Sequence, residues 1–202
     1  MLRGFFIKAI IKEINFSKRE KNYKTIDVAG GTGDIAFRIA KKAQEKNLNY
    51  QIEVVDINPQ MLEVGRSRAV DLNLFSRLNF VENDGEKLNF PDESFDVIIC
   101  TEVFEHDIQY DKTIANIIRM LKTGGIFVFT CAAPDRPEHG TRRTSPWHAK
   151  LLEEVSEEWS DYYKNLTEVD FKNAFDIEEM FSIHKFEFHD HPGDLHFCGL
   201  KK

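Results

Sequence analysis

The segment 27–34, which reads DVAGGTGD, joins a β-like run to a helical run and has the composition of a ligand-binding turn. Glycines at such a turn let the chain bend tightly and let a ligand approach the main chain. The helix that follows offers free backbone N–H groups and the positive end of its dipole. Residues 31–36 also fit the dinucleotide pattern G-x-G-x-x-A. The segment predicts a nucleotide-like site, and a tight turn without a ligand is the alternative.

Polar residues end each of the next three predicted strands. Asp56 ends the second strand, where a carboxylate can accept both hydroxyls of a ribose. Asn83 and Asp84 end the third, where a carboxylate can accept a hydrogen bond from the amino group of an adenine. Thr101 and Glu102 end the fourth. A dinucleotide dehydrogenase would need a catalytic group, and the chain contains no Tyr-x-x-x-Lys pair.

Three polar side chains beyond the fourth strand are candidates for acid–base chemistry. If a helix begins there, Glu102 and His106 lie one turn apart on one face, and a carboxylate beside an imidazole raises its basicity. His139 lies in the polar loop after the fifth strand, and such loops often carry function. We predict Glu102, His106 and His139 as catalytic residues. Helix capping, packing under the loop and exposure to solvent are the alternatives.

The same loop carries Arg136, Arg142 and Arg143 in an otherwise acidic chain. Guanidinium groups bind carboxylate or phosphate in a bidentate way. We therefore expect the loop to hold an acidic or phosphorylated acceptor. The alternative is that these arginines pair with surface acids such as Glu153 and Glu154.

Composition excludes several classes of protein. The 202 residues carry a net charge of −7, which argues against a general nucleic-acid binder. No stretch approaches the roughly 18 consecutive apolar residues of a membrane span. The lysines Lys8 and Lys12 interrupt the first apolar run, so we expect no signal peptide. We read the three cysteines as free thiols and expect a cytoplasmic monomer or homodimer.

The elements that must position these residues alternate between strands and helices. Predicted strands cover 25–29, 51–56, 78–82, 95–101 and 126–131, followed by 181–188 and 195–200. Predicted helices cover 34–46, 59–70, 113–121, 150–163 and 167–175. Such alternation predicts a doubly wound, mostly parallel α/β sheet, and the last two strands must be antiparallel to each other. We expect one domain over 1–202, with an N-terminal cap helix over 1–22 and an acceptor-side insertion over 132–165.

Several segments carry a family resemblance. The segments 27–34, 54–62 (VVDINPQML), 90–97 (FPDESFDV) and 121–125 (LKTGG) resemble a class I S-adenosylmethionine (SAM)-dependent methyltransferase. Over residues 25–131 the sequence is similar to those of the ubiquinone/menaquinone C-methyltransferases. The resemblance implies SAM as cofactor and a Rossmann-like seven-stranded sheet with an antiparallel last strand.

The resemblance also implies which residues contact the cofactor. Gly31 and Gly33 would line its methionine part, Asp56 would bind the ribose, and Ile57 and Met61 would flank the adenine. The full predicted cofactor site consists of Asp27, Ala29, Gly30, Gly31, Gly33, Asp56, Ile57, Met61, Asp84, Gly85 and Thr101. Within this set, Asp84 would face the adenine amino group. Ala29 stands where many relatives have a glycine, so its contact rests on the backbone alone.

The second half departs from the quinone enzymes. Residues 101–106 (TEVFEH) resemble the Glu-x-x-Glu-His segment of many small-molecule O-methyltransferases. The loop 131–146 resembles uncharacterised methyltransferases that accompany sugar-processing genes. Glu102, Glu105 and His106 are also similar to residues that hold a divalent metal in small-RNA 2′-O-methyltransferases, whose downstream His-x-Phe-Glu-Trp-like segment is missing here. We therefore expect no metal, and activity that survives a chelator.

These observations predict a SAM-dependent methyltransferase that O-methylates a polar small molecule, sugar-like or acidic. One alternative is C-methylation of a quinol-like lipid, and another is a SAM-binding partner protein without activity. A polar pocket favours the first reading, and a long apolar channel favours the quinol.

Overall fold

A seven-stranded sheet organises the chain, which the computed structural model describes over residues 22–146 and 159–202. Its strands are β1 (Asn22–Val28), β2 (Asn49–Asp56), β3 (Leu78–Glu82), β4 (Phe95–Thr101), β5 (Leu121–Ala132), β6 (Phe181–His189) and β7 (Asp194–Lys201). The spatial order is β3-β2-β1-β4-β5-β7-β6, and β7 runs antiparallel to both of its neighbours. The predicted fold class is therefore confirmed.

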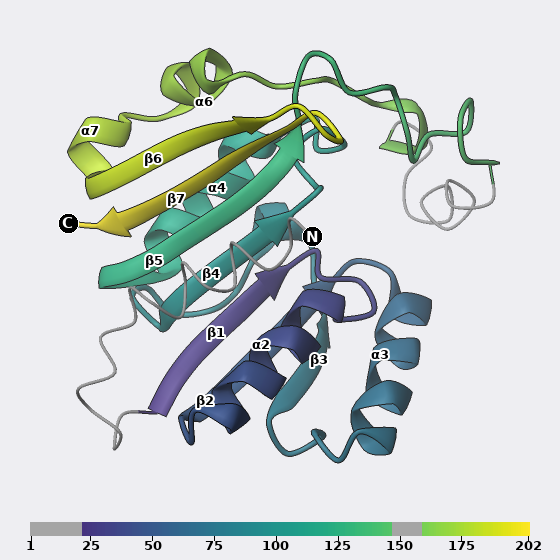
Figure 1. Ribbon diagram of the computed structural model, residues 1–202, viewed down its shortest axis with the longest axis vertical. Helices are drawn as coiled ribbons and strands as arrows, with labels where there is room; N and C mark the ends of the chain where they lie inside the picture. Colours follow the sequence, from purple (N-terminus) through teal and green to yellow (C-terminus); the bar gives the residue numbers. More distant parts are fainter. Residues whose placement is uncertain (1–21, 147–158) are drawn as a thin grey trace.

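Helices cover both faces of the sheet, as Figure 1 shows with α2 and α3 in front and α4 behind. The described helices are α2 (Asp34–Glu45), α3 (Pro59–Asp71), α4 (Tyr110–Met120), α6 (Glu168–Ala174) and α7 (Ile177–Met180), with short 3-10 turns η1 (Gly85–Lys87) and η2 (Trp159–Asp161). Within residues 22–146 and 159–202, no helix combines the length and the apolar character that crossing a membrane requires. Strand order reverses at β1, which puts a crevice between the ends of β1 and β4.

Two apolar layers hold this arrangement together. Side chains alternate along each strand, so Ile98 packs toward α4 and the neighbouring Ile99 toward α2. The α4 layer is rich in phenylalanine: the ring centroid of Phe129 lies 4.4 Å from that of Phe171 on α6 and 5.1 Å from that of Phe197 on β7. Packing of these rings fixes the carboxyl ends of β4 and β5, where the predicted catalytic residues begin.

The sequence located some element boundaries and missed others. The bounds of β3 and β4 match the prediction, and so does the capping box at Thr167, whose amide donates to the Asp170 carboxylate at 2.9 Å. The predicted fifth strand at 126 is too short, because β5 begins at Leu121. A register shift lets Leu121 pair with Phe95 and Ile126 with Val97 around the turn at Gly124.

Parts of the sequence prediction fall where the chain is not described. The cap helix over 1–22 lies almost entirely outside the described residues, and Asn22 itself begins β1. Most of the helix over 150–163 also lies outside them. The described parts of the 132–165 segment are loop and the short turn η2. Cys100 and Cys131 are buried free thiols, as predicted, whereas Cys198 is free but only half-buried, although we expected all three to be buried.

Candidate active site

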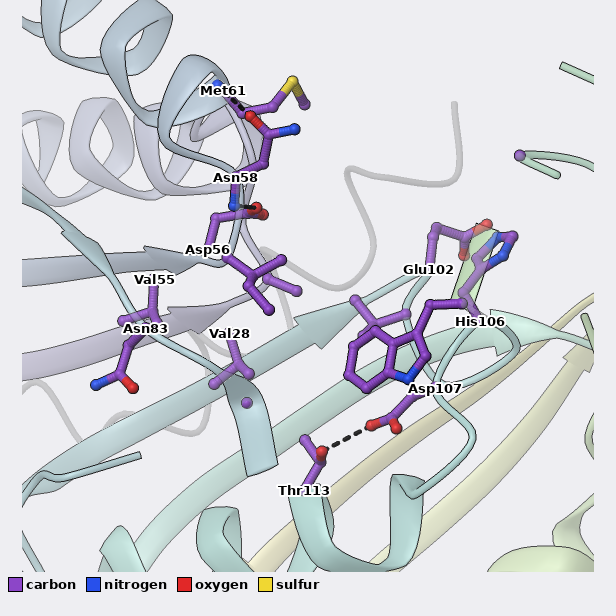
Figure 2. A pocket seen from close by; sticks show the side chains of 16 residues that line it. Val28, Val55, Asp56, Asn58, Met61, Asn83, Glu102, His106, Asp107 and Thr113 are labelled. Carbon is purple, nitrogen blue, oxygen red and sulfur yellow. Dashed lines mark hydrogen bonds between the residues drawn. The ribbon is translucent and has the colours of Figure 1, made fainter. Parts of the chain in front are cut away.

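A cavity of about 390 Å³ opens at the carboxyl ends of the strands, where the strand order reverses. Figure 2 shows Asp56 and Met61 at one end and Glu102 and His106 at the other. The first end is the predicted cofactor side, and the second is the predicted acceptor side. The sequence thus predicted residues at both ends of one pocket.

The carboxylate of Asp56 is held in place by backbone amides. One oxygen accepts from the Gly31 N–H at 2.9 Å and the other from the Asn58 N–H at 2.8 Å. The Asn58 side chain in turn caps α3, accepting from the amides of Gln60 and Met61. Each carboxylate oxygen keeps acceptor capacity toward the cavity. Burial raises the pKa of Asp56, and the amide hydrogen bonds oppose that rise.

The glycine turn leaves room beside this carboxylate. Gly31 has φ +55°, and a Cβ there would meet the Met61 Cε at 3.0 Å. Gly33 caps α2 at φ +80° without a side-chain hydrogen bond. A carboxylate at a strand end, apolar side chains beside it and a backbone without side chains together fit a nucleoside-bearing ligand such as SAM.

The predicted cofactor residues divide into two groups. Those that line the cavity are Ala29, Asp56, Ile57, Met61 and Gly85. Those that do not are Asp27, Gly30, Gly31, Gly33, Asp84 and Thr101, although Gly31 contacts Asp56 directly.

Asp84 was expected to face the cofactor, but it does not line the cavity. Its carboxylate caps η1, accepting from the Glu86 N–H at 2.9 Å and from Lys87 at 3.2 Å. Asn83 lines the cavity in its place. The sequence put both residues at the end of β3, and the choice between them depends on which side the chain turns after the strand.

Asp27 is buried beneath the turn, 1% exposed, and neither carboxylate oxygen makes a hydrogen bond within the described chain. Burial raises its pKa from 3.8 to about 7, although the nearby Ala36 amide opposes the shift. A carboxyl with a raised folded pKa binds a proton that the unfolded chain has already released. The contribution of Asp27 to the free energy of unfolding therefore falls as pH rises from about 4 to about 7.

Replacing Asp27 with asparagine should remove that loss, because the amide has a similar shape and no charge. Relative to the wild type, Asp27→Asn should gain stability between about pH 4 and pH 7, by up to about 4 kcal/mol. Urea unfolding of both proteins at pH 4, 5.5, 7 and 8.5 measures the difference. A stability difference that stays constant across this range would show that Asp27 does not titrate as its burial requires.

At the acceptor end, the predicted helical pairing of Glu102 with His106 is wrong. Residues 102–109 form turns, α4 starts only at Tyr110, and Glu102 adopts φ +58°. One Glu102 oxygen accepts from the Thr130 hydroxyl at 2.7 Å, and the other pairs with Arg136 at 2.6 Å. Glu102 lines the cavity, but Arg136 neutralises its charge.

His106 lies in an aromatic cluster instead. Its ring centroid is 5.3 Å from that of His139 and 5.3 Å from that of Tyr163, both edge to face. Burial, followed by the proximity of His139, lowers the pKa of His106 to about 4. The expected rise in basicity is therefore reversed. His106 lines the cavity, whereas His139 stands behind it.

Two further residues, Glu105 and Tyr163, complete this cluster. Glu105 is fully buried, and burial followed by the charge of Glu102 raises its pKa to about 8. Its Oε1 lies 3.8 Å from the Nε2 of His139. Tyr163, on the far side of the loop, has its hydroxyl 3.2 Å from the Nδ1 of His139. The sequence pointed to Glu105 only as a ligand in the metal alternative, and it gives no signal for Tyr163.

The three arginines face carboxylates of this chain. Arg136 pairs with Asp194 as well as with Glu102, and Arg142 pairs with Asp161. The side chain of Arg143 binds Glu138 at 2.8 Å. This agrees with the alternative that the arginines pair with acids. The observed partners are Glu102 after β4, Glu138 in the loop, Asp161 of η2 and Asp194 of β7.

A family model and individual relatives of this chain point to the same family. The model of the ubiE/COQ5 methyltransferase family matches residues 6–143. The ubiquinone/menaquinone biosynthesis C-methyltransferase UbiE of a Bradyrhizobium strain is 42% identical over 119 residues, which cover 59% of this chain and 46% of that protein. The UbiE of Rickettsia massiliae is 38% identical over 107 residues, covering 53% and 43%. The chain spans about half the length of these curated relatives.

Solved structures share the fold at low sequence identity. The CurJ carbon methyltransferase matches with a TM-score of 0.74 and 16% identity, covering 98% of this chain and 54% of that one. A phosphoethanolamine N-methyltransferase of Haemonchus contortus, solved with SAM, matches with a TM-score of 0.67 and 16% identity, covering 98% and 52%.

Proposed function

This chain belongs to the ubiE/COQ5 methyltransferase family, and on that premise we propose that it is a SAM-dependent methyltransferase whose acceptor is a small polar molecule. SAM, when bound, supplies an electrophilic methyl group on a sulfonium centre. The residues that would hold it are Asp56, for the ribose hydroxyls, and Ile57 and Met61, beside the base. Asn83 and Gly85 complete that end of the cavity.

The acceptor would lie at the other end, against His106. The observation that carries this assignment is that Glu102, His106 and Asp107 line the cavity at that end, while most of the rest of its wall is apolar. Thr113 donates to Asp107 at 2.6 Å, which fixes that carboxylate. Trp159 and Val103 add an apolar wall that keeps water from part of the site. Most of the catalytic effect would come from holding the acceptor atom in line, since methyl transfer is a direct displacement.

His106 is suited to accepting a hydrogen bond from an acceptor hydroxyl. With a pKa of about 4 its imidazole is neutral near pH 7, so one ring nitrogen carries a lone pair. The same low pKa makes it a weak base. O-methylation at this site therefore suits a hydroxyl that is acidic in itself or is polarised by another group. The three arginines have no part in this proposal, because each is paired with a carboxylate.

C-methylation of a quinol-like lipid is the second candidate. The names of the UbiE relatives favour it, and those relatives match more than half of this chain. A quinol would also present a ring hydroxyl to His106, while the methyl group goes to a neighbouring ring carbon. The two candidates differ in the bond that is formed and in the polarity of the acceptor.

Methyl-labelled SAM can separate these candidates. The protein is incubated with a panel of polyhydroxylated metabolites and phenols in buffer, and with short-chain quinols in detergent, and products are identified by mass spectrometry. We expect label on an oxygen of a polar acceptor. Label found only on quinol ring carbons would establish the second candidate instead. SAM binding without any labelled product across the panel would favour the inactive binding protein.

A further inference from the structure

We propose that Glu105, His106 and His139 bind a divalent transition-metal ion at the acceptor end of the cavity. Each residue offers one ligand atom, and the three atoms all lie within 4.8 Å of one another. Within the described residues this is the one group of three or more acidic, histidine or cysteine side chains with such spacing. Binding such an ion requires neither SAM nor an acceptor, so the inference goes beyond the proposed function.

Glu105 supplies the independent observation that a cation belongs here. Its side chain is fully buried, and neither oxygen makes a hydrogen bond within the described chain. The amides of Glu105 and Ala132 approach it, but not with hydrogen-bonding geometry. Buried carboxyl groups are normally paired, hydrogen-bonded or coordinated to a metal. Glu102, three residues earlier, has both oxygens engaged and is not available in the same way.

The two histidines are oriented as metal ligands usually are. The Nδ1 of His139 lies 3.2 Å from the Pro137 carbonyl oxygen and 3.2 Å from the Tyr163 hydroxyl. These contacts leave its Nε2 directed to Glu105, at 3.8 Å from Oε1. The backbone of Tyr162 approaches the His106 ring and opposes the fall in its pKa. A metal-binding histidine typically has its second ring nitrogen held by a carbonyl, a carboxylate or water in this way.

The donor set indicates which ion would bind and in which direction its free coordination position would point. Two imidazoles and one carboxylate suit Zn²⁺ and similar first-row ions rather than Mg²⁺, which prefers oxygen ligands. Three protein ligands leave a coordination position free. His106 and Gly140 line the cavity, and a Cβ at Gly140 would meet the His106 Cε1 at 2.8 Å. The free position would thus open toward the acceptor, where a bound ion would polarise an acceptor oxygen.

This site differs from the metal alternative considered from the sequence. That alternative used Glu102, Glu105 and His106, lacked the downstream segment, and treated a replacement by His139 or His148 as a coincidence. Here the loop supplies His139 as the downstream ligand, and Arg136 and Thr130 occupy Glu102 instead. The sequence led us to expect that activity survives a chelator. In this proposal, activity requires the ion instead.

Calorimetric titration of Zn²⁺ into EDTA-treated, dialysed protein tests the site directly. We expect one ion per chain and, in Glu105→Gln and in His139→Gln, a loss of affinity of about tenfold or more. Two matched controls should retain the wild-type affinity. Glu53→Gln makes the same chemical change on β2, where Glu53 binds the Asn79 side chain, and His184→Gln removes a histidine on β6 that pairs with Glu178 on α7.

Three results would overturn the proposal: no stoichiometric binding, wild-type affinity in both cluster variants, or an equal loss in the controls. A second histidine pair, His189 and His196, has ring centroids 4.1 Å apart and could bind Zn²⁺ elsewhere. Loss of binding in His189→Gln but not in His139→Gln would place the ion there and refute the site. If Glu105→Gln has a lowered melting temperature, His139→Gln still tests the site, because the His139 side chain is partly exposed. SAM titrated into the same protein in EDTA tests the proposed function separately.

Discussion

Replacing Asp56 with alanine should weaken SAM binding by roughly 1.5–3 kcal/mol, or about 10- to 150-fold. The carboxylate lies in the cavity wall at the end of β2, and backbone amides of Gly31 and Asn58 fix its orientation. A ribose bound there would lose a charged acceptor for its hydroxyls. Isothermal titration calorimetry of SAM and of its demethylated product measures the loss.

The matched control for this change is Glu53→Ala, which removes one carboxylate from the same strand. Glu53 points away from the cavity and accepts from the Asn79 side chain at 2.7 Å. It should bind SAM as the wild type does. Because Asp56→Ala also frees two amides, Asp56→Asn is measured alongside it and should give a smaller loss. Unchanged SAM affinity in Asp56→Ala would remove this end of the cavity as the cofactor site.

Replacing His106 with alanine should lower turnover by about 100-fold or more once an acceptor is known. His106 is the imidazole that lines the acceptor end, and it is surrounded by His139 and Tyr163. In the proposed function, its loss would remove the group that contacts the acceptor, whether that group accepts a proton or holds an ion. SAM binding should be nearly unchanged, because Asp56 lies at the opposite end (Figure 2).

Kinetics and calorimetry together distinguish this role from general damage. A fall in kcat with intact SAM affinity indicates an interaction made at the reacting end. His184→Gln serves as control, because His184 lies on β6 and pairs with Glu178. Wild-type turnover in His106→Ala would mean that the acceptor binds elsewhere.

Much of the fold could be predicted, because its signals are local. Continuous apolar runs gave the bounds of β4, and Thr167 with Asp170 gave the start of α6. Asp56 was located because it ends a strand whose last residues are apolar and buried. Each of these signals spans only a few residues and follows from strand periodicity or from helix capping.

The acceptor end could not be predicted, because it depends on contacts between distant segments. Glu102 adopts a left-handed conformation after β4, which the sequence does not reveal, and Arg136 then neutralises it across 34 positions. The contact of His139 with Tyr163 joins residues on two sides of the loop. Burial of Glu105 and the lowered pKa of His106 follow from that packing rather than from their neighbours in sequence.

The most direct measurement of what this cavity holds is titration of SAM and of NAD into the wild-type protein, followed by calorimetry and thermal melting. SAM should bind one molecule per chain and raise the melting temperature by mass action, while NAD should do neither. Binding of NAD with no response to SAM would contradict the assignment of Asp56 and the glycine turn to a SAM site.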